Sequence, residues 1–364
     1  MSKKRGLQIL KLLIALGGLW YVITQIQWAD VAVIESNHSA QKQSHFPIAA
    51  YRLDGKIKLN NGNIIDAEQC KILRGATATI SQAKWGYVLV SFLLMGIVYP
   101  IQSFRWWVLM RSRKIIVPYL KVWRVWLIGC FMSFFMPGTT GGDLFKAYHA
   151  AKGAKQKGLG VLTVIVDRLL GLIGLLIVAG TLGLFHLDQP VIRSAVYMIA
   201  GTLTIVLVGA MIYFSRPFRK LRLFAWLENF KWIAKIDRGI IAYRHHKTAL
   251  VIGLALSLVV QLLLALMGSL AAKAMGIQLH LVLVMSAVPL MMMMAAIPFT
   301  YQGFGVMEAV GFTLLGFQGG ASTNQIVAMI LLMRLFAVLY GLLGGLCLIK
   351  GDINLHHVQA DIDQ

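Results

Sequence analysis

Charged residues are scarce in this chain, and acidic ones are especially so. Only 13% of the 364 residues are Asp, Glu, Lys or Arg, and 58% are hydrophobic, whereas a soluble domain typically carries roughly 25% charged residues. The 14 acidic residues face 35 Lys and Arg, which gives a formal net charge of +21. This composition excludes a soluble, a disordered or a fibrous protein. Apolar runs of about 20 residues, long enough to cross a ~30 Å hydrocarbon core, recur along the sequence. We therefore predict an all-α polytopic membrane protein.

Cysteine and the common cofactor-binding motifs are also lacking. Cys70, Cys130 and Cys347 are far apart and form no CxxC pair, so neither a zinc site nor a disulfide framework is expected. The sequence has no P-loop, no HExxH and no GxSxG motif, which argues against an ATPase, a metalloprotease and a serine hydrolase. We expect no metal, no cofactor and no enzymatic activity. The positive charge is attributed to membrane orientation and not to nucleic-acid binding.

Long apolar segments and two shorter, broken ones define the expected topology. The predicted spans are 1–28, 85–110, 159–184, 191–214, 248–272 and 325–349. The apolar pieces 125–136 and 281–297 are too short to cross and run into Pro- and Gly-containing breaks, so each is expected to begin a re-entrant hairpin. The expected architecture is about six full spans plus two re-entrant broken helical hairpins.

A polar insertion, residues 29–84, separates the first two spans. Its Asp-Gly and Asn-Gly turn signals between short alternating stretches predict a small β-rich module on the extracytoplasmic side. The remaining membrane core covers 85–350, and 351–364 form a polar cytoplasmic tail. Lys and Arg are concentrated in loops such as 215–247, which the positive-inside rule places in the cytoplasm. We expect a multi-pass protein of the prokaryotic cytoplasmic membrane, with both termini cytoplasmic.

The two halves of the chain repeat one pattern in opposite orientation. Each half has two spans, a broken hairpin and a further span, and the hairpins are expected to break at Pro137, Gly138 and Pro298. After each break come glycines, a carboxylate and then an arginine within the next span. These residues are Gly141, Gly142, Asp143 and Arg168 in the first half, and Gly303, Gly305, Glu308 and Arg334 in the second. The carboxylate precedes the arginine by 25 positions (168 − 143) and by 26 positions (334 − 308), respectively.

Inverted repeats with broken helices are typical of secondary transporters, whose substrate sites lie near the bilayer midplane. An arginine at that depth is energetically costly and normally has a partner. We therefore predict that the two arginines, the two carboxylates and the hairpin glycines bind substrate. The alternative is a purely structural role, in which Arg168 pairs with Asp167 or Asp143, and Arg334 pairs with Glu308.

Several of these motifs resemble one known family. Arg105-Trp106, the stretch 134–143, Val166-Asp-Arg168 and the stretch 298–308 are similar to the membrane domain of lysylphosphatidylglycerol synthase/flippase proteins, which also occurs alone as a flippase-like membrane protein. The resemblance covers nearly the whole chain except 29–84, an insertion outside the usual pattern. We expect no C-terminal aminoacyl-transferase domain like that of the bifunctional members. The resemblance implies movement of lipids or lipid-linked intermediates across the membrane.

Together these features predict a flippase-like transporter of phospholipids or polyprenyl-phosphate-linked intermediates. Arg168 and Arg334 would bind the phosphate of an anionic phospholipid or lipid-linked phosphate, and an envelope-biosynthesis enzyme is a further expected partner. Two alternatives stay open. One is a membrane-embedded transferase with Asp143 or Glu308 as general base; the other is an accessory subunit in envelope lipid or glycan biosynthesis that recruits a partner through the insertion. Near-equal motifs in both halves favour transport, because an enzyme needs one asymmetric site.

Overall fold

The structure, a computed structural model, describes most of the membrane core and the strands of the insertion. The described residues are 30–35, 43–51, 56–59, 63–66, 71–73, 75–135, 141–152, 157–214, 243, 246–296, 303–316 and 321–349. The predicted first span, the break residues Pro137, Gly138 and Pro298, and the tail 351–364 lie outside these ranges.

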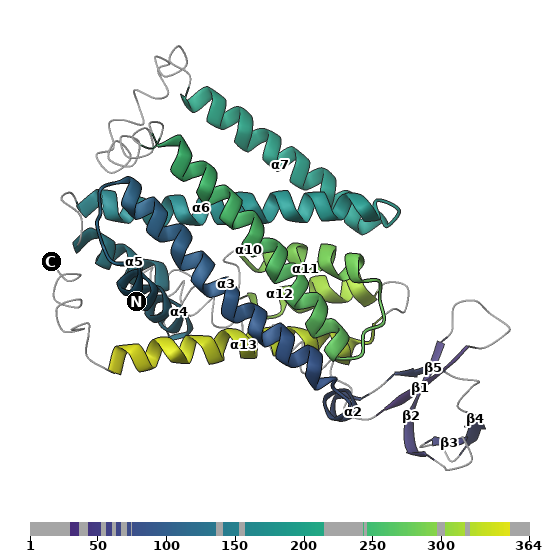
Figure 1. The fold of residues 1–364 in the computed structure, drawn as a ribbon. Coiled ribbons are helices and arrows are strands. Elements are labelled where there is room, and N and C mark those ends of the chain that lie inside the picture. Colours follow the sequence, from purple (N-terminus) through teal and green to yellow (C-terminus); the bar gives the residue numbers. More distant parts are fainter. Residues whose placement is uncertain are drawn as a thin grey trace, which may run out of the picture.

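The insertion is a five-stranded antiparallel sheet. Its strands are β1 (Val31–Glu35), β2 (Gln43–Tyr51), β3 (Lys56–Leu59), β4 (Ile64–Asp66) and β5 (Lys71–Leu73), in the order β4-β3-β2-β1-β5. The Asp30 carboxylate accepts a 2.6 Å hydrogen bond from the Gly75 N–H, so the chain enters and leaves the module at one point. Figure 1 shows the sheet projecting from the helical core at one end of α3. The β-rich character of this segment is confirmed, and its side of the membrane stays a prediction.

Long apolar helices coincide with the predicted spans. They are α3 (Trp85–Ser112), α6 (Lys157–Gly183) with the short η2 (Leu184–His186), α7 (Pro190–Phe214), α10 (Lys247–Ala274) and α13 (Thr323–Ile349). Within the described ranges, four helices are long and apolar enough to cross a membrane, namely α3, α6 with η2, α10 and α13. Many of their large apolar side chains are exposed, for example Leu89 and Leu339, as expected of helices that face lipid.

Two pairs of shorter helices lie where the hairpins are predicted. The first pair is α4 (Tyr119–Phe135) and α5 (Gly141–Lys152), and the second is α11 (Leu281–Ala296) and α12 (Val306–Gly311), which continues into the π-helical η5 (Phe312–Gly316). At ~1.5 Å per residue, the 17 residues of α4 extend only ~25 Å, less than a ~30 Å core. Helix α4 starts before its predicted apolar piece. Its first turns include Lys121 and Arg124, whose charged side chains are exposed and therefore compatible with a helix. The helices stop on either side of both predicted breaks, and their depth in a membrane stays a prediction.

The helices pack around a large apolar core and a smaller apolar cluster, and glycine allows close contact at several crossings. Helix α3 packs along α10, α4 packs along α13, and α11 packs against both α6 and α10. On α13, the Cα of Gly344 lies against the Leu127 carbonyl of α4, where a Cβ would collide with backbone. Short helix α2 (Ala76–Ser81) packs on α13 and joins the insertion to the core. The arrangement brings both hairpins against the long helices that carry the predicted arginines.

Candidate substrate-binding site

The first predicted arginine and carboxylate lie together where α5 meets α6. Asp143 is in the first turn of α5, and the Nε atom of Arg168 lies 2.5 Å from its Oδ2 atom. The Nζ atom of Lys146, one turn further along α5, lies 3.2 Å from Oδ1 of the same carboxylate. The side chains of Arg168, Asp143 and Lys146 are 52%, 20% and 12% exposed. This cluster, which we call the open cluster, therefore consists of a carboxylate shared by two cations and reaches the surface through Arg168.

The second predicted pair lies where α12 meets α13, and it is much more buried. The Nη2 atom of Arg334 lies 3.3 Å from Glu308 Oε1, and the two side chains are 17% and 2% exposed. The Gly305 N–H donates a 2.8 Å hydrogen bond to Glu308 Oε2. The Arg334 guanidinium carbon lies 3.8 Å from the centroid of the Phe304 ring, in the range of a cation–π contact. We call these residues the closed cluster.

The two arginines occupy the same position in their helices. Helices α6 and α13 both have 27 residues, and Arg168 and Arg334 each stand 11 residues after the first one (168 − 157 and 334 − 323). Of the two partners that the sequence allowed for Arg168, the structure selects Asp143. The pairing of Arg334 with Glu308 is also observed. Whether these residues bind substrate stays a prediction.

The predicted glycines lie at tight places in the hairpins. Gly142 on α5 faces the Gly129 carbonyl of α4, and a Cβ there would collide with it; Gly141 is likewise buried. Gly303 and Gly305 have φ angles of +70° and +82°, in the left-handed region that glycine adopts without steric cost. The left-handed backbone at Gly305 directs its N–H to Glu308. The described glycines therefore shape the hairpins and the carboxylate positions.

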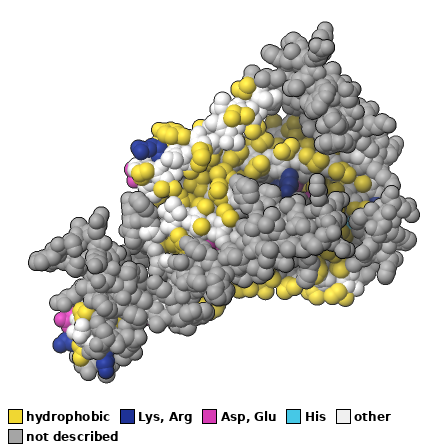
Figure 2. All heavy atoms as spheres, turned by 180° about the vertical axis from the view of Figure 1, so that it is seen from behind, with side chains coloured by type: hydrophobic (Ala, Val, Ile, Leu, Met, Phe, Trp, Pro, Cys, Tyr) yellow, Lys and Arg dark blue, Asp and Glu magenta, His cyan; other side chains and the backbone are white. Residues whose placement is uncertain are grey.

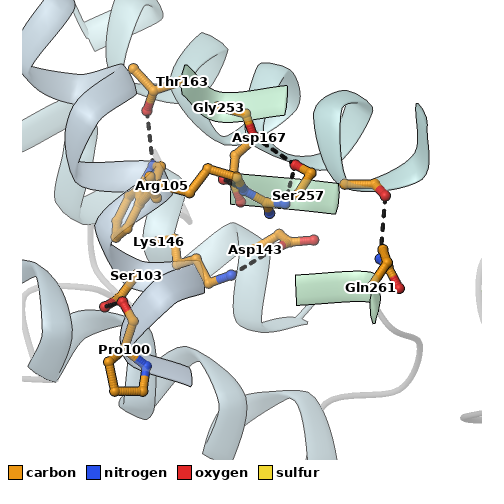
Figure 3. A network of polar contacts seen from close by, with 12 residues as sticks. Pro100, Ser103, Arg105, Asp143, Lys146, Thr163, Asp167, Gly253, Ser257 and Gln261 are labelled. Atoms are coloured by element: carbon orange, nitrogen blue, oxygen red, sulfur yellow. Dashed lines mark hydrogen bonds and ion pairs between the residues drawn. The ribbon is translucent and has the colours of Figure 1, made fainter. Parts of the chain in front are cut away.

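A further ion pair, which is buried, and a hydrogen bond from its arginine join three long helices, and the sequence reasoning did not single them out. Arg105 Nε on α3 lies 2.7 Å from Asp167 Oδ1 on α6, and the side chains are 7% and 9% exposed. The Arg105 Nη1 group donates a 2.7 Å hydrogen bond to Ser257 Oγ on α10, whose hydroxyl donates to the Gly253 carbonyl (Figure 3). A signal existed in the sequence, because a charged residue within an apolar span is rarely left without function or partner. Arg105 was noticed only as part of a family-like motif.

Helix α6 thus carries two adjacent charged residues that contact different neighbours. Successive helical residues point roughly 100° apart, so Asp167 faces Arg105 and the helical core, while Arg168 faces Asp143 and the first hairpin. Figure 3 shows the Arg105 network and the Asp143–Lys146 pair in the same region of the molecule. Since Asp167 is engaged by Arg105 and Ser257 completes that network, Asp143 is the carboxylate that meets Arg168.

The open cluster lies in a setting suited to an amphiphile. Arg168 is half exposed, while its neighbour Leu169 and nearby Leu172 on α6 are exposed apolar residues. Figure 2 shows that apolar side chains dominate the described part of one face of the molecule, with few charged side chains among them. A guanidinium can engage phosphate through two parallel hydrogen bonds. In the described ranges, no three His, Cys, Asp or Glu side chains are grouped so that they could hold a metal ion.

Comparison with known proteins identifies one match. Residues 73–345 match the family described as the lysylphosphatidylglycerol synthase TM region. The match includes every helix from α3 to α12 and most of α13, and it leaves out β1 to β4 of the insertion. No curated protein and no solved structure matches the chain.

Proposed function

The chain belongs to the family of the lysylphosphatidylglycerol synthase TM region, and from this membership we propose that it moves phospholipids or polyprenyl-phosphate-linked lipids across the membrane. The family and the apolar helices make it a multi-pass membrane protein with a lipid-related, flippase-like function. The proposal adds the substrate class and the residues. Its main support is that two arginines at the same position in their helices each pair with a carboxylate from a broken hairpin.

An inverted repeat accounts for this arrangement. Helices α3 and α10 both have 28 residues, and α6 and α13 both have 27. The short helices α4 and α5 lie between α3 and α6, and α11 and α12 with η5 lie between α10 and α13. The halves exchange contacts, because α4 packs along α13 while α11 packs against α6. Two related halves that interlock in this way can adopt two alternative arrangements around a shared site. We propose that these arrangements open the site to opposite sides of the bilayer.

In the proposed mechanism, a phosphate headgroup takes the place of the carboxylate at an arginine. Asp143 and Glu308 neutralise Arg168 and Arg334 while the site is empty, which removes the cost of an unpaired charge at depth. An arriving phosphate offers the arginine oxygens of similar charge, so the arginine keeps an anionic partner, while the released carboxylate needs another donor. The acyl or polyprenyl chains remain in the lipid beside the apolar helix surfaces.

We further propose that the protein lies in a prokaryotic cytoplasmic membrane, with the loop between α7 and α10 and both termini in the cytoplasm. Its proposed partners are an anionic phospholipid or lipid-linked phosphate and an envelope-biosynthesis enzyme. Cysteines introduced at positions 40 and 188 should then react with an impermeant reagent from outside, and cysteines at 155 and 235 should not. Reaction at 155 from outside would require the first hairpin to cross the membrane.

The transferase alternative is less well supported by the geometry. A general base needs a carboxylate oxygen that is free to accept the substrate proton. Both oxygens of Glu308 accept hydrogen bonds, and each oxygen of Asp143 lies within ion-pair distance of a cation. The family match also covers a membrane region and not a synthase domain. We therefore propose a role without enzymatic activity.

The decisive experiment measures transbilayer movement by the purified protein. Protein in liposomes that contain a fluorescent phosphatidylglycerol should expose inner-leaflet label to an external quencher faster than protein-free liposomes. Arg168→Gln should abolish this acceleration. Arg193→Gln is the matched control, because Arg193 is an exposed arginine on α7 that belongs to neither cluster. Equal rates with and without wild-type protein, or an active Arg168→Gln variant, would contradict the proposal.

A further inference from the structure

In each cluster, the two oxygens of the carboxylate contact two different kinds of donor. One oxygen contacts the arginine of the following long helix: Asp143 Oδ2 meets Arg168, and Glu308 Oε1 meets Arg334. The other oxygen contacts a donor in its own hairpin. Asp143 Oδ1 is held by Lys146 at 3.2 Å, and Glu308 Oε2 is held by the Gly305 N–H at 2.8 Å.

The contact with Lys146 is local, whereas the contact with Arg168 joins two elements. Lys146 and Asp143 lie one turn apart on α5, so their contact persists however α5 moves relative to α6. Arg168 approaches from α6 and is 52% exposed, against 12% for Lys146. A relative movement of the hairpin and α6 therefore breaks the arginine contact and leaves the lysine contact intact.

Helix α4 is built to keep Lys146 in place. Its ammonium nitrogen lies 5.2 Å from the centroid of the Trp126 ring. A Cβ at position 129 would lie 3.1 Å from Lys146 Cε, so Gly129 leaves room for the lysine stem. Trp126 and Gly129 thus fix the lysine from the side opposite to solvent.

This division matters when Arg168 leaves the carboxylate. A largely buried carboxylate without a partner is strongly unfavourable, so Asp143 could not release Arg168 to a headgroup unless another cation stayed with it. We propose that Lys146 is this positioning residue: it retains Asp143 through Oδ1, so that Arg168 is free to bind an anionic headgroup. The inference rests on the proposed function.

The test is a double-mutant cycle on binding. Short-chain phosphatidylglycerol is titrated calorimetrically into the purified protein in detergent, for wild type, Lys146→Met, Asp143→Asn and the variant with both changes. Lys146→Met keeps the apolar stem and should weaken binding about tenfold or more, since a hydrogen bond to a charged group contributes about that factor. In the Asp143→Asn background, the loss of Lys146 should change the dissociation constant little, because a neutral amide needs no cation.

Control variants and stability measurements separate the possible outcomes. Lys146→Arg should bind nearly as well as wild type, and so should Lys152→Met, which removes an exposed lysine from the same helix. Thermal unfolding of the same preparations detects misfolding, and if Lys146→Met alone does not fold, the comparison of Asp143→Asn with the double variant decides. Weak binding by the double variant relative to Asp143→Asn would show that Lys146 contacts the headgroup directly and would overturn the inference.

The same measurements distinguish the inference from the proposed function. If wild type binds and moves the lipid and Lys146→Met binds equally well, the inference fails and the proposed function stands. If wild type neither binds nor moves it, the proposed function fails and the inference fails with it.

Discussion

The open and closed clusters use one pattern of residues in two different environments. In the open cluster, Asp143 is shared by Lys146 and Arg168, and Arg168 is half exposed. In the closed cluster, Glu308 is 2% exposed and Arg334 lies against Phe304. The comparison teaches that one pattern of residues, present twice in the chain, can be exposed at one place and buried at the other. If they form one transport pathway, this structure has the first half accessible and the second half occluded.

The largest expected effect is loss of transport when either pair is neutralised. The variant with Asp143→Asn and Arg168→Gln, and the variant with Glu308→Gln and Arg334→Gln, should both fold and insert, because each leaves a neutral pair. Both should fail to move labelled lipid in liposomes, since no guanidinium is left for the headgroup. Activity in only one variant would restrict the substrate site to the other cluster, and two fully active variants would make all four charges structural.

The next effect concerns stability, where the clusters should differ. Arg334→Ala leaves Glu308 buried without its cation and should destabilise the protein by about 3–5 kcal/mol. Arg168→Ala leaves Asp143 with the cation of Lys146, which lies 3.2 Å from Oδ1, so its destabilisation should be smaller. Denaturant unfolding of both variants in the same detergent measures the difference. Equal destabilisation would mean that the difference in burial has no energetic consequence.

A smaller effect is expected at the backbone of the closed cluster. Gly305 has a φ angle of +82°, and a side chain in a left-handed conformation costs about 1–2 kcal/mol. Gly305→Ala should therefore lower stability by that amount and loosen the N–H contact with Glu308. Gly86→Ala is the control, because that helical glycine on α3 has open space where a Cβ would lie. An unfolding free energy equal to that of the control would contradict the strain argument.

The smallest effect is expected at Phe304. The cation–π contact with Arg334 contributes about 0.5–2 kcal/mol, so Phe304→Leu should destabilise only slightly. Since Phe304 covers the guanidinium, the substitution should also make Arg334 react faster with phenylglyoxal, as mass spectrometry of the modified peptide would show. Unchanged reactivity would mean that Phe304 does not shield Arg334, and that the two clusters differ less than their geometry indicates.

The fold was largely predictable because the bilayer constrains it so strongly. A span needs about 20 apolar residues, so the positions of α3, α6, α10 and α13 follow from hydropathy alone. Proline and glycine end helices, and the described short helices α4, α5, α11 and α12 flank the two predicted breaks. The β-rich insertion was indicated by its turn residues, but its strand order depends on pairings that local sequence does not encode. The bounds of α4 were missed because basic residues on an exposed helix side resemble a loop.

The sequence by itself determined which charges matter within the apolar segments, because a charged side chain at depth is costly and must be compensated. It also determined the spacing that makes Asp143–Arg168 and Glu308–Arg334 possible. Only the tertiary structure decided between Asp143 and Asp167 as the partner of Arg168. Arg105 on α3 engages Asp167, and contacts between helices distant in the sequence depend on helix rotation, which is set by packing. Burial was decided in the same way: two similar motifs differ in exposure because different neighbours cover them.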